Sequence, residues 1–431
     1  MKIQRLHLKN FRNVADETYT FDPHFTVIIG INGKGKSTWL NALRVACGAY
    51  LLSIPDAKSR HIEPNEIRFA SEGTFVSSQT PVLVEAVGTF VDLKKPIEWR
   101  RRIPSGKIKT TSSNEDVGAI RDLGKMKYDA MLKGSDALDL PVIAYFGTSR
   151  AYGAARNRNL DTRIRRQIFK DGYHSWFEMR STSYQYNSWL MSYDLMVKEG
   201  KEYPESKAAF FQALRIANPF IKDIEFSGTG LWLKVEMDGY TSETLPISLH
   251  SDGITSFTEM AAELAYRCIV LNGYKRNKSI TDTQGVVMID ELDLHLHPNW
   301  QRHVVQDLKN AFPGIQFVAT THSPFIVQSL KREELINLDN LEGLETNPRN
   351  FGVEDVAEVE MGVKDIPRSE PFLEMVHTAE QYYQLIAEGK NSKTDQETAE
   401  LRHKLNELEE RYSDDAAFVA LLKSERQAQK L

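Results

Sequence analysis

The chain has 431 residues, a formal net charge of −5, an apolar content of 41% and two cysteines. This length allows one large domain with insertions or two domains, and the acidic balance argues against nucleic-acid binding over the whole surface. Two cysteines in apolar contexts are typical of buried thiols in a reducing cytosol. The start has no apolar signal segment, and no run reaches the ~18 apolar residues of a membrane helix, so we expect a cytoplasmic protein without membrane contact.

The first motif follows a predicted buried strand. Apolar residues alternate along 1–26 and then run together at 27–29, which predicts two strands and a third, buried one. The next residues, GINGKGKS at 30–37, fit G-x-x-x-x-G-K-[ST] at every fixed position. Glycines let such a loop turn its N–H groups toward phosphate oxygens. Lys36 is placed to reach the β- and γ-phosphates, and the Ser37 hydroxyl to join a Mg²⁺ shell.

This phosphate-binding loop (P-loop) predicts a site for ATP and Mg²⁺. A helix from Ser37 to about Gly48 would direct its positive end at the bound anion. A surface turn rich in glycine and lysine is the alternative, which the strand before the loop and the helix after it disfavour. The predicted nucleotide-binding residues are Asn32, Gly33, Lys34, Gly35, Lys36, Ser37 and Thr38.

The middle of the chain mixes strand and helix patterns. Strands are indicated at 81–93 and 140–146, helices at 185–217 and a hairpin at 221–237. A basic cluster with interleaved aromatic residues lies at 150–180. Its cations are Arg150, Arg156, Arg158, Arg163, Arg165, Arg166, Lys170 and Arg180. Guanidinium groups bind phosphates, so this cluster is the best candidate for DNA contact, although a solvated helix face would look the same.

A second motif lies about 250 residues after the P-loop. The apolar run at 286–289 is followed directly by Asp290 and Glu291. After this motif, a strand is indicated at 316–320 and charged helices from about residue 354. A buried strand that ends in aspartate supplies an oxygen ligand for Mg²⁺. The following Glu291 is placed to orient or deprotonate the attacking water. Alternating strands and helices at both ends predict a three-layer α/β core split by an insertion.

The motifs together resemble a known family. ELDLHLHP at 291–298, GINGKGKST at 30–38 and THSP at 321–324 are similar to ATP-binding-cassette (ABC) ATPases, in the branch of RecF, SMC proteins and overcoming-lysogenization-defect nucleases. The opening IQRLHLKNFRN resembles the start of that branch. The chain is also similar to PtuA-like ATPases of Septu and retron-associated anti-phage systems. Two features carry this resemblance: the tail FGVEDVAEVEMGV, and the lack of a strand ending in D-x-D, as a nuclease domain would have, after residue 325.

The resemblance implies roles for single residues. Lys36 and Ser37 match the P-loop lysine and the Mg²⁺ hydroxyl, Asp290 the Walker B aspartate that also binds the metal, and Glu291 the catalytic glutamate. His322 matches the switch histidine, which senses the γ-phosphate. Ser251 and Gly253 match the signature motif, which in this family caps the γ-phosphate bound by the other subunit of a head-to-tail dimer.

Two departures and two alternatives accompany this match. His250 stands before Ser251 where the family usually has leucine, and the segment YFGTSR at 145–150 has no glutamine where a Q-loop is expected. Ser251-Asp252-Gly253 is also good chemistry for an ordinary turn at a helix start. A metal site made of His295, His297 and His322 is disfavoured, because L-H-x-H-P after Asp-Glu belongs to the family's D-loop region.

The expected fold class is therefore α/β, an ABC-ATPase head with a P-loop core, an inserted mixed or helical lobe and a helical C-terminal tail. The resemblance implies an ATPase without a nuclease site of its own, which dimerises around ATP as a homodimer or higher even-numbered oligomer. It would gate an HNH-type endonuclease in anti-phage defence. The expected lobes are 1–150, 151–240 with the basic cluster, 241–345 with the signature and Walker B motifs, and the extension 346–431.

Two other functions stay open. One is a RecF-like DNA-repair ATPase or an ATP-gated DNA clamp with negligible turnover. The other is the ATPase subunit of a membrane transporter, which the opening sequence, the long insertion and the lack of a Q-loop glutamine disfavour.

Overall fold

The computed structural model describes residues 1–55, 57–72, 75–135, 137–149, 168–177, 183–228, 230–237, 239–339, 346–363, 370–388, 390 and 395–411. The chain forms two compact units, Met1–Met361 and Gly362–Leu431. Most of the predicted basic cluster at 150–180 lies outside the described residues, and of its cations only Lys170, in α3 (Ile168–Gly172), lies within them.

A five-stranded parallel sheet is the centre of the first unit. Its strand order is β15 (Leu335–Asn337), β3 (Phe25–Ile29), β14 (Ile315–Thr320), β13 (Gly285–Ile289) and β8 (Val142–Phe146). Every residue of β3, β13 and β14 is buried. Near-continuous apolar runs are typical of parallel strands, because both faces of such a sheet are covered. The strands predicted at 27–29, 140–146, 286–289 and 316–320 are all present, whereas β15 was not predicted.

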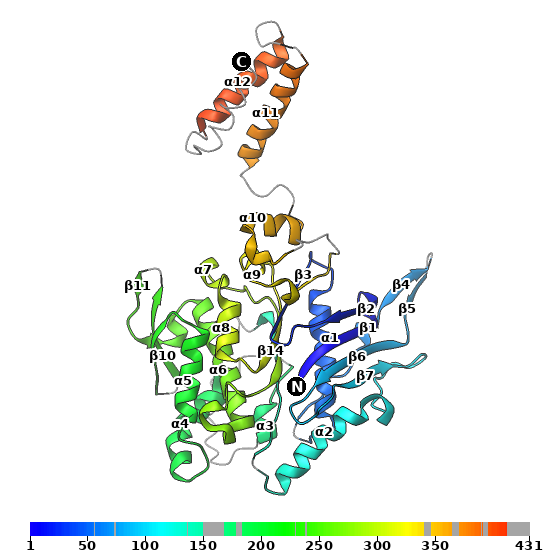
Figure 1. Cartoon of the computed structure of the whole chain (residues 1–431), viewed down its shortest axis with the longest axis vertical. Coiled ribbons are helices and arrows are strands. Elements are labelled where there is room, and N and C mark those ends of the chain that lie inside the picture. The colour runs from blue at the N-terminus through cyan, green and yellow to red at the C-terminus, as the bar shows by residue number, and fades with distance from the viewer. Residues whose placement is uncertain are drawn as a thin grey trace. The chain divides into compact units, whose positions relative to one another are not determined.

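A second, antiparallel sheet lies on the other side of the first helix. It has the strand order β2 (Val14–Thr20), β1 (Lys2–Phe11), β6 (Val82–Thr89) and β7 (Ile97–Ile103). Burial alternates along β6, because one face packs on the core and the other does not. Helix α1 (Lys36–Gly48) contacts strands of both sheets and lies between them in Figure 1. The predicted α/β fold class, with a parallel sheet and helices, is confirmed.

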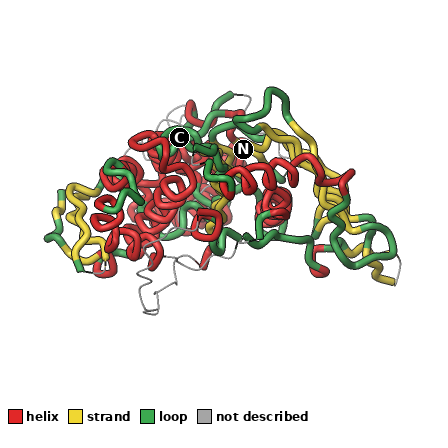
Figure 2. The backbone as a smooth tube through the Cα atoms, turned by 90° about the horizontal axis from the view of Figure 1, so that it is seen from below, coloured by secondary structure: helices red, strands yellow, loops and turns green. Residues whose placement is uncertain are grey.

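Helices cover the far side of the parallel sheet. The long helix α6 (Asp252–Asn272) is buried along most of its length and contacts α3, α4 (Ser183–Lys198), α5 (Ser206–Ala217) and β8. The hairpin of β9 (Ile221–Ser227) and β10 (Gly230–Met237) lies at the end of the unit opposite to the hairpin of β4 and β5 (Figures 1 and 2). The remaining elements are α2 (Asn114–Leu132), β4 (Phe69–Glu72), β5 (Phe75–Ser78), β11 (Tyr240–Thr241), β12 (Leu245–Pro246), α7 (Pro298–Gln301), α8 (Val304–Ala311), α9 (Pro324–Gln328) and α10 (Val353–Asp355).

The second unit is a helical hairpin. Helices α11 (Glu370–Ala387) and α12 (Gln396–Arg411) contact each other, with Tyr382 and Leu405 among their buried side chains. Both helices lie in the region whose charged, helical composition predicted helices. No helix among the described residues is long and apolar enough to cross a membrane.

One buried glutamine joins the two sheets. Gln316 lies on β14 and is fully buried. Its Nε2 donates hydrogen bonds to Ile3 O (2.7 Å) and Asp22 O (2.8 Å), and its Oε1 accepts one from Ile3 N (2.7 Å). The amide therefore pairs three backbone groups of the segments at the start of β1 and before β3. Such groups are costly to bury without a partner.

We expect Gln316→Leu to lower the free energy of unfolding by about 2–4 kcal/mol, because a similar volume is kept while the buried backbone groups of Ile3 and Asp22 lose their partners. Urea unfolding followed by circular dichroism measures the change. The matched control is Gln306→Leu on the exposed face of α8, which should shift stability by less than about 0.5 kcal/mol. Equal effects of the two substitutions would contradict the assignment.

Candidate functional site

The P-loop connects β3 to α1, and its glycines have backbone angles that other residues rarely adopt. Gly30, Gly33 and Gly35 have φ angles of 153°, 89° and 103°. Glycine adopts such angles without steric cost. A Cβ on Gly35 would also lie 2.6 Å from the side chain of Asn13. The motif glycines are therefore required by the backbone path, and Asn32 and Lys34 between them are exposed.

Lys36 is the buried cation of this loop. Its Nζ donates a hydrogen bond of 2.6 Å to Gly30 O, so the side chain folds back over the loop that precedes it. Burial lowers the pKa of Lys36, and the carboxylates of Asp339, Asp290 and Glu291 act in the opposite direction. A partly desolvated cation above a glycine-rich loop is suited to binding an anion.

Asn13 holds the other end of the loop. Its Nδ2 donates to Lys34 O (2.8 Å), and its Oδ1 accepts from the hydroxyl of Thr38 (2.8 Å). Asn13 lies in the turn between β1 and β2, so the antiparallel sheet sets the position of the P-loop. Asn13 belongs to the opening IQRLHLKNFRN, but it was not among the predicted site residues.

Asp290 meets Ser37 across 253 residues of sequence. The Ser37 hydroxyl donates to Asp290 Oδ2 at 3.1 Å, and the Thr320 hydroxyl donates to Asp290 Oδ1 at 2.6 Å. Asp290 follows β13 and Thr320 ends β14, and neighbouring parallel strands end at the same edge of a sheet. Hydroxyl and carboxylate oxygens of this kind are ligands that Mg²⁺ prefers. The donor set therefore fits Mg²⁺, and Thr320, which orients Asp290, was not among the predicted site residues.

The loop after Asp290 begins in a strained conformation. Glu291 has a φ of 51°, and its N–H donates to the Thr320 hydroxyl at 2.8 Å. Within the same loop His295 has a φ of 62°. Left-handed angles are uncommon for residues other than glycine and are often found at functional sites. Glu291 is half-buried, so its carboxylate is neither fully solvated nor enclosed.

Asp293 connects this loop to the segment that carries His322. Its Oδ1 accepts hydrogen bonds from the Thr321 hydroxyl (2.5 Å) and from His322 N (3.2 Å). The side chain of His322 is exposed. Asp290 and Glu291 follow β13 and His322 follows β14, at the sheet edge where the P-loop begins, and their roles stay predictions. Asp293 was not predicted, although it lies within the ELDLHLHP motif.

The signature segment lies at the start of α6. Ser251 precedes the helix, is exposed and makes no capping hydrogen bond with its side chain. Gly253 is buried, and a Cβ at that position would lie 2.2 Å from His295 O. Only glycine lets α6 approach the loop that follows Glu291 so closely. His250, which replaces the usual leucine, has its Nε2 at 3.1 Å from Leu233 O and so anchors the segment to β10.

Two other predictions concern the same edge of the sheet. Thr148 and Ser149 follow β8 and are exposed, and Phe146 O accepts a hydrogen bond from Asp290 N (2.7 Å), so this segment borders the site without supplying a glutamine. The exposed His295 and His297 stand in the loop after Glu291. Within the described part of the chain, no group of three or more histidine, cysteine, aspartate or glutamate side chains is arranged to hold a metal ion.

The chain matches known protein families over most of its length. Residues 5–219 match the family described as "AAA domain", and residues 179–328 match the family described as "AAA domain, putative AbiEii toxin, Type IV TA system". The "retron Vc95 probable ATPase" of Vibrio cholerae is 24% identical over 79% of this chain and 74% of its own length. Septu protein PtuA of Bacillus thuringiensis is 36% identical over 26% of this chain and 30% of its own length.

These matches differ in how much of each relative they cover. Less than a third of that PtuA is matched, so the similarity to PtuA concerns one part of both proteins. Among solved structures, the SMC head domain from Thermotoga maritima is 16% identical, with a TM-score of 0.43 over 76% of this chain and 92% of that one. The chain therefore carries AAA ATPase domains, matched over residues 5–328, and is homologous to the retron Vc95 probable ATPase and to Septu PtuA.

Proposed function

We propose that the chain binds ATP with Mg²⁺ and hydrolyses it at a site completed by a second copy of the chain. The observation that carries the proposal is the contact between Ser37 and Asp290 beside the buried Lys36. Lys36 and the backbone of 32–38 bind the phosphates, and Ser37 and Asp290 hold the metal ion. Bound Mg²⁺ neutralises charge on the phosphates during transfer.

The remaining residues act on water and on the γ-phosphate. Glu291 orients the attacking water and accepts its proton, a role supported by a carboxylate at the edge of the site on a loop that Thr320 and Asp293 hold in place. His322 senses the γ-phosphate, which its position next to the Asp293 contact supports. Glu291 is half-buried, so a water molecule has access to it.

Ser251 and Gly253 complete the site of the neighbouring copy. Ser251 is exposed, its hydroxyl has no capping role, and the N-terminal end of the 21-residue helix α6 is favourable for an anion. A surface of this kind is suited to a phosphate that another chain carries. The arrangement requires a head-to-tail homodimer or a higher even-numbered oligomer.

Mixing two inactive variants tests the shared site. Lys36→Ala and Ser251→Arg should each abolish ATP hydrolysis, because every site of either homodimer then lacks one half. In an equal mixture, half of the dimers are hybrids with one intact site, so about a quarter of the wild-type rate should return. Hydrolysis is measured by phosphate release, and differently tagged copies report that hybrids form. Hybrids without any recovered activity would reject the shared site.

We also propose that ATP hydrolysis gates an HNH-type endonuclease in anti-phage defence, with DNA contact through the cluster at 150–180 and no nuclease site in this chain. The similarity to the retron Vc95 ATPase and to PtuA supports the defence role. A RecF-like repair ATPase or an ATP-gated DNA clamp is the alternative. Co-purification with an HNH nuclease encoded beside this gene, together with DNA cleavage that depends on ATP, would favour the defence role over the alternative. If the cluster at 150–180 contacts DNA phosphates, the affinity for DNA should fall as the salt concentration rises.

A further inference from the structure

An acidic side chain lies against the backbone of the P-loop. β15 runs parallel to β3, and beyond its end Leu338 N donates to Ile29 O (3.0 Å). The next residue, Asp339, accepts a hydrogen bond from Ile31 N at its Oδ2 (2.8 Å). A Cβ on Gly30 would lie 3.6 Å from both carboxylate oxygens of Asp339. The carboxylate therefore occupies a backbone donor at the start of a loop built to bind anions.

The charge of Asp339 works against a bound phosphate. Among the carboxylates that oppose the lowered pKa of Lys36, Asp339 has the largest effect, so its negative charge acts on the same cation that the phosphates need. Its Oδ1 is buried and has no hydrogen-bond partner among the described residues. A buried carboxylate oxygen without a partner is costly, and a second anion beside it adds repulsion. Asp339 is thus destabilised when phosphates enter the loop.

The backbone of Asp339 is connected to the segment from which the helical hairpin unit departs. Asp339 N donates to Asn337 Oδ1 (3.0 Å), and Asn337 Nδ2 donates to Glu360 O (2.7 Å). Glu360 is fully buried, and its Oε1 accepts from Arg332 Nη1 (2.6 Å). The first unit ends at Met361. Asp339 and Asn337 thus link the Ile31 N–H of the P-loop to Glu360, which directly precedes the last residue of the first unit.

We propose that Asp339 is an internal anion that competes with the nucleotide phosphates for the P-loop. Asn337 transmits its displacement to the segment 356–361, so that occupancy of the loop changes how this segment is held. The inference rests on the proposed nucleotide binding and adds to it a positioning residue that sets affinity. It also assigns a path by which the bound nucleotide acts on the C-terminal extension.

Asp339→Asn tests the competition. The amide keeps an oxygen that accepts from Ile31 N–H but removes the charge, so ATP should bind about 5- to 10-fold more tightly, as expected for one partly screened charge near the phosphates. Equilibrium binding of a fluorescent ATP analogue measures the Kd, and steady-state hydrolysis should show a lower KM with kcat changed less than about twofold. A residue with a merely structural role would weaken binding or leave it unchanged.

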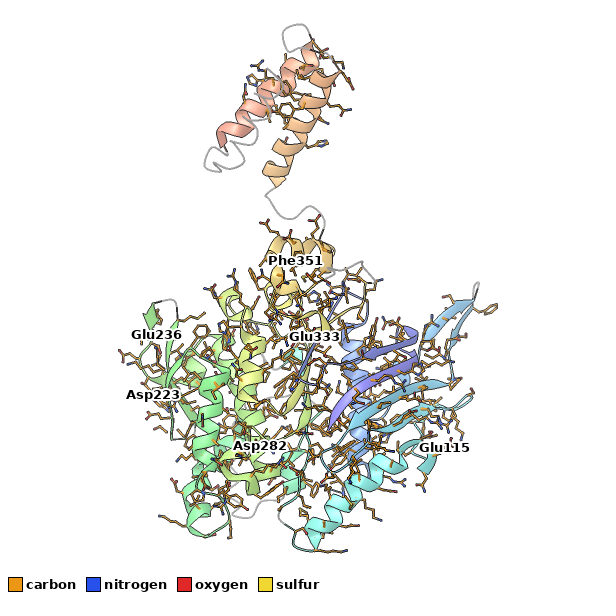
Figure 3. All side chains as sticks on the ribbon, in the orientation of Figure 1. Glu115, Asp223, Glu236, Asp282, Glu333 and Phe351 are labelled. Atoms are coloured by element: carbon orange, nitrogen blue, oxygen red, sulfur yellow. The ribbon has the colours of Figure 1, made fainter. Side chains whose placement is uncertain are left out.

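The matched control is Asp282→Asn. Asp282 precedes β13 at the opposite edge of the sheet, and in Figure 3 it lies at the other end of the first unit from Phe351. The same loss of charge there should leave the Kd unchanged. If Asp339→Asn binds ATP no more tightly than the wild-type protein, the inference about Asp339 is wrong while the proposed function stands. If the wild-type protein binds no ATP, the proposed function is wrong as well.

Hydrogen exchange tests the connection without relying on one variant. In the wild-type protein, ATP should speed amide exchange in 356–361 and leave the strand β13 unchanged. Asn337→Ala should show fast exchange in 356–361 with and without ATP, because the hydrogen bond from Asn337 to Glu360 O is then absent. Exchange in 356–361 that ATP does not alter in the wild-type protein would overturn the proposed path.

Discussion

Lys36→Ala is expected to weaken ATP binding by at least about 100-fold. The lysine is the one buried cation of the P-loop 30–37, and its ammonium group would form charge-assisted hydrogen bonds with the phosphates. Two such bonds are worth about 3–4 kcal/mol, and each 1.4 kcal/mol is a tenfold change in affinity. Equilibrium binding of a fluorescent ATP analogue in the presence of Mg²⁺ measures the loss.

The control for this prediction is the other lysine of the same loop. Lys34 is exposed, and its anchoring contact to Asn13 uses the backbone carbonyl, which substitution preserves. Lys34→Ala should therefore weaken ATP binding only a few-fold. Unchanged affinity in Lys36→Ala would refute the nucleotide site, and equal losses in both variants would mean that general charge, rather than the position of Lys36, determines binding.

Glu291→Gln is expected to lower kcat about 10²- to 10³-fold while ATP binding is kept. An amide has nearly the shape of the carboxylate, but it cannot accept the proton of the attacking water. The contacts that hold the loop, from Glu291 N to Thr320 and from Thr321 to Asp293, do not involve the substituted group. ATP should then persist between two copies, and a dimer should accumulate.

Single-turnover hydrolysis and light scattering measure the two effects of Glu291→Gln. The matched control is Glu333→Gln, an exposed glutamate of the same unit that Figure 3 labels, and it should retain wild-type turnover and form no ATP-dependent excess of dimer. Unimpaired turnover in Glu291→Gln would refute the assignment of Glu291. Loss of turnover without accumulation of dimer would support Glu291 as the general base but would refute the trapped dimer.

The contiguous parts of the site were predictable, because each is a local requirement of the chain. Glycines 30, 33 and 35 adopt positive φ angles within one short loop, and the apolar strand before Asp290 is buried on both faces. The P-loop and the strand that ends before Asp290 are both short motifs. Together they led to the prediction that Ser37 and Asp290 bind the same metal ion. The roles of Glu291, His322 and Ser251 remain predictions that the variants above test.

Single residues without a motif could not be predicted. Thr320, Asn13 and Asp339 each make one or two hydrogen bonds that determine the shape of the site, and no spacing in the sequence distinguishes them from other polar residues. A weak signal existed for Asp339, because it follows a short apolar segment, as Asp290 does. The strand β15 is only three residues long, which is too short for its periodicity to be recognised.

The sequence by itself determined that this chain has a P-loop, a strand ending in Asp290 and an α/β core, because these depend on local backbone angles and on apolar periodicity. Only the tertiary structure decided which side chains share the site. Ser37 and Asp290 are 253 residues apart in sequence and meet because β3 and β13 end at one edge of the same parallel sheet. At that edge β15 brings Asp339 to the P-loop. Such contacts depend on strand order and register, which no stretch of the sequence contains alone.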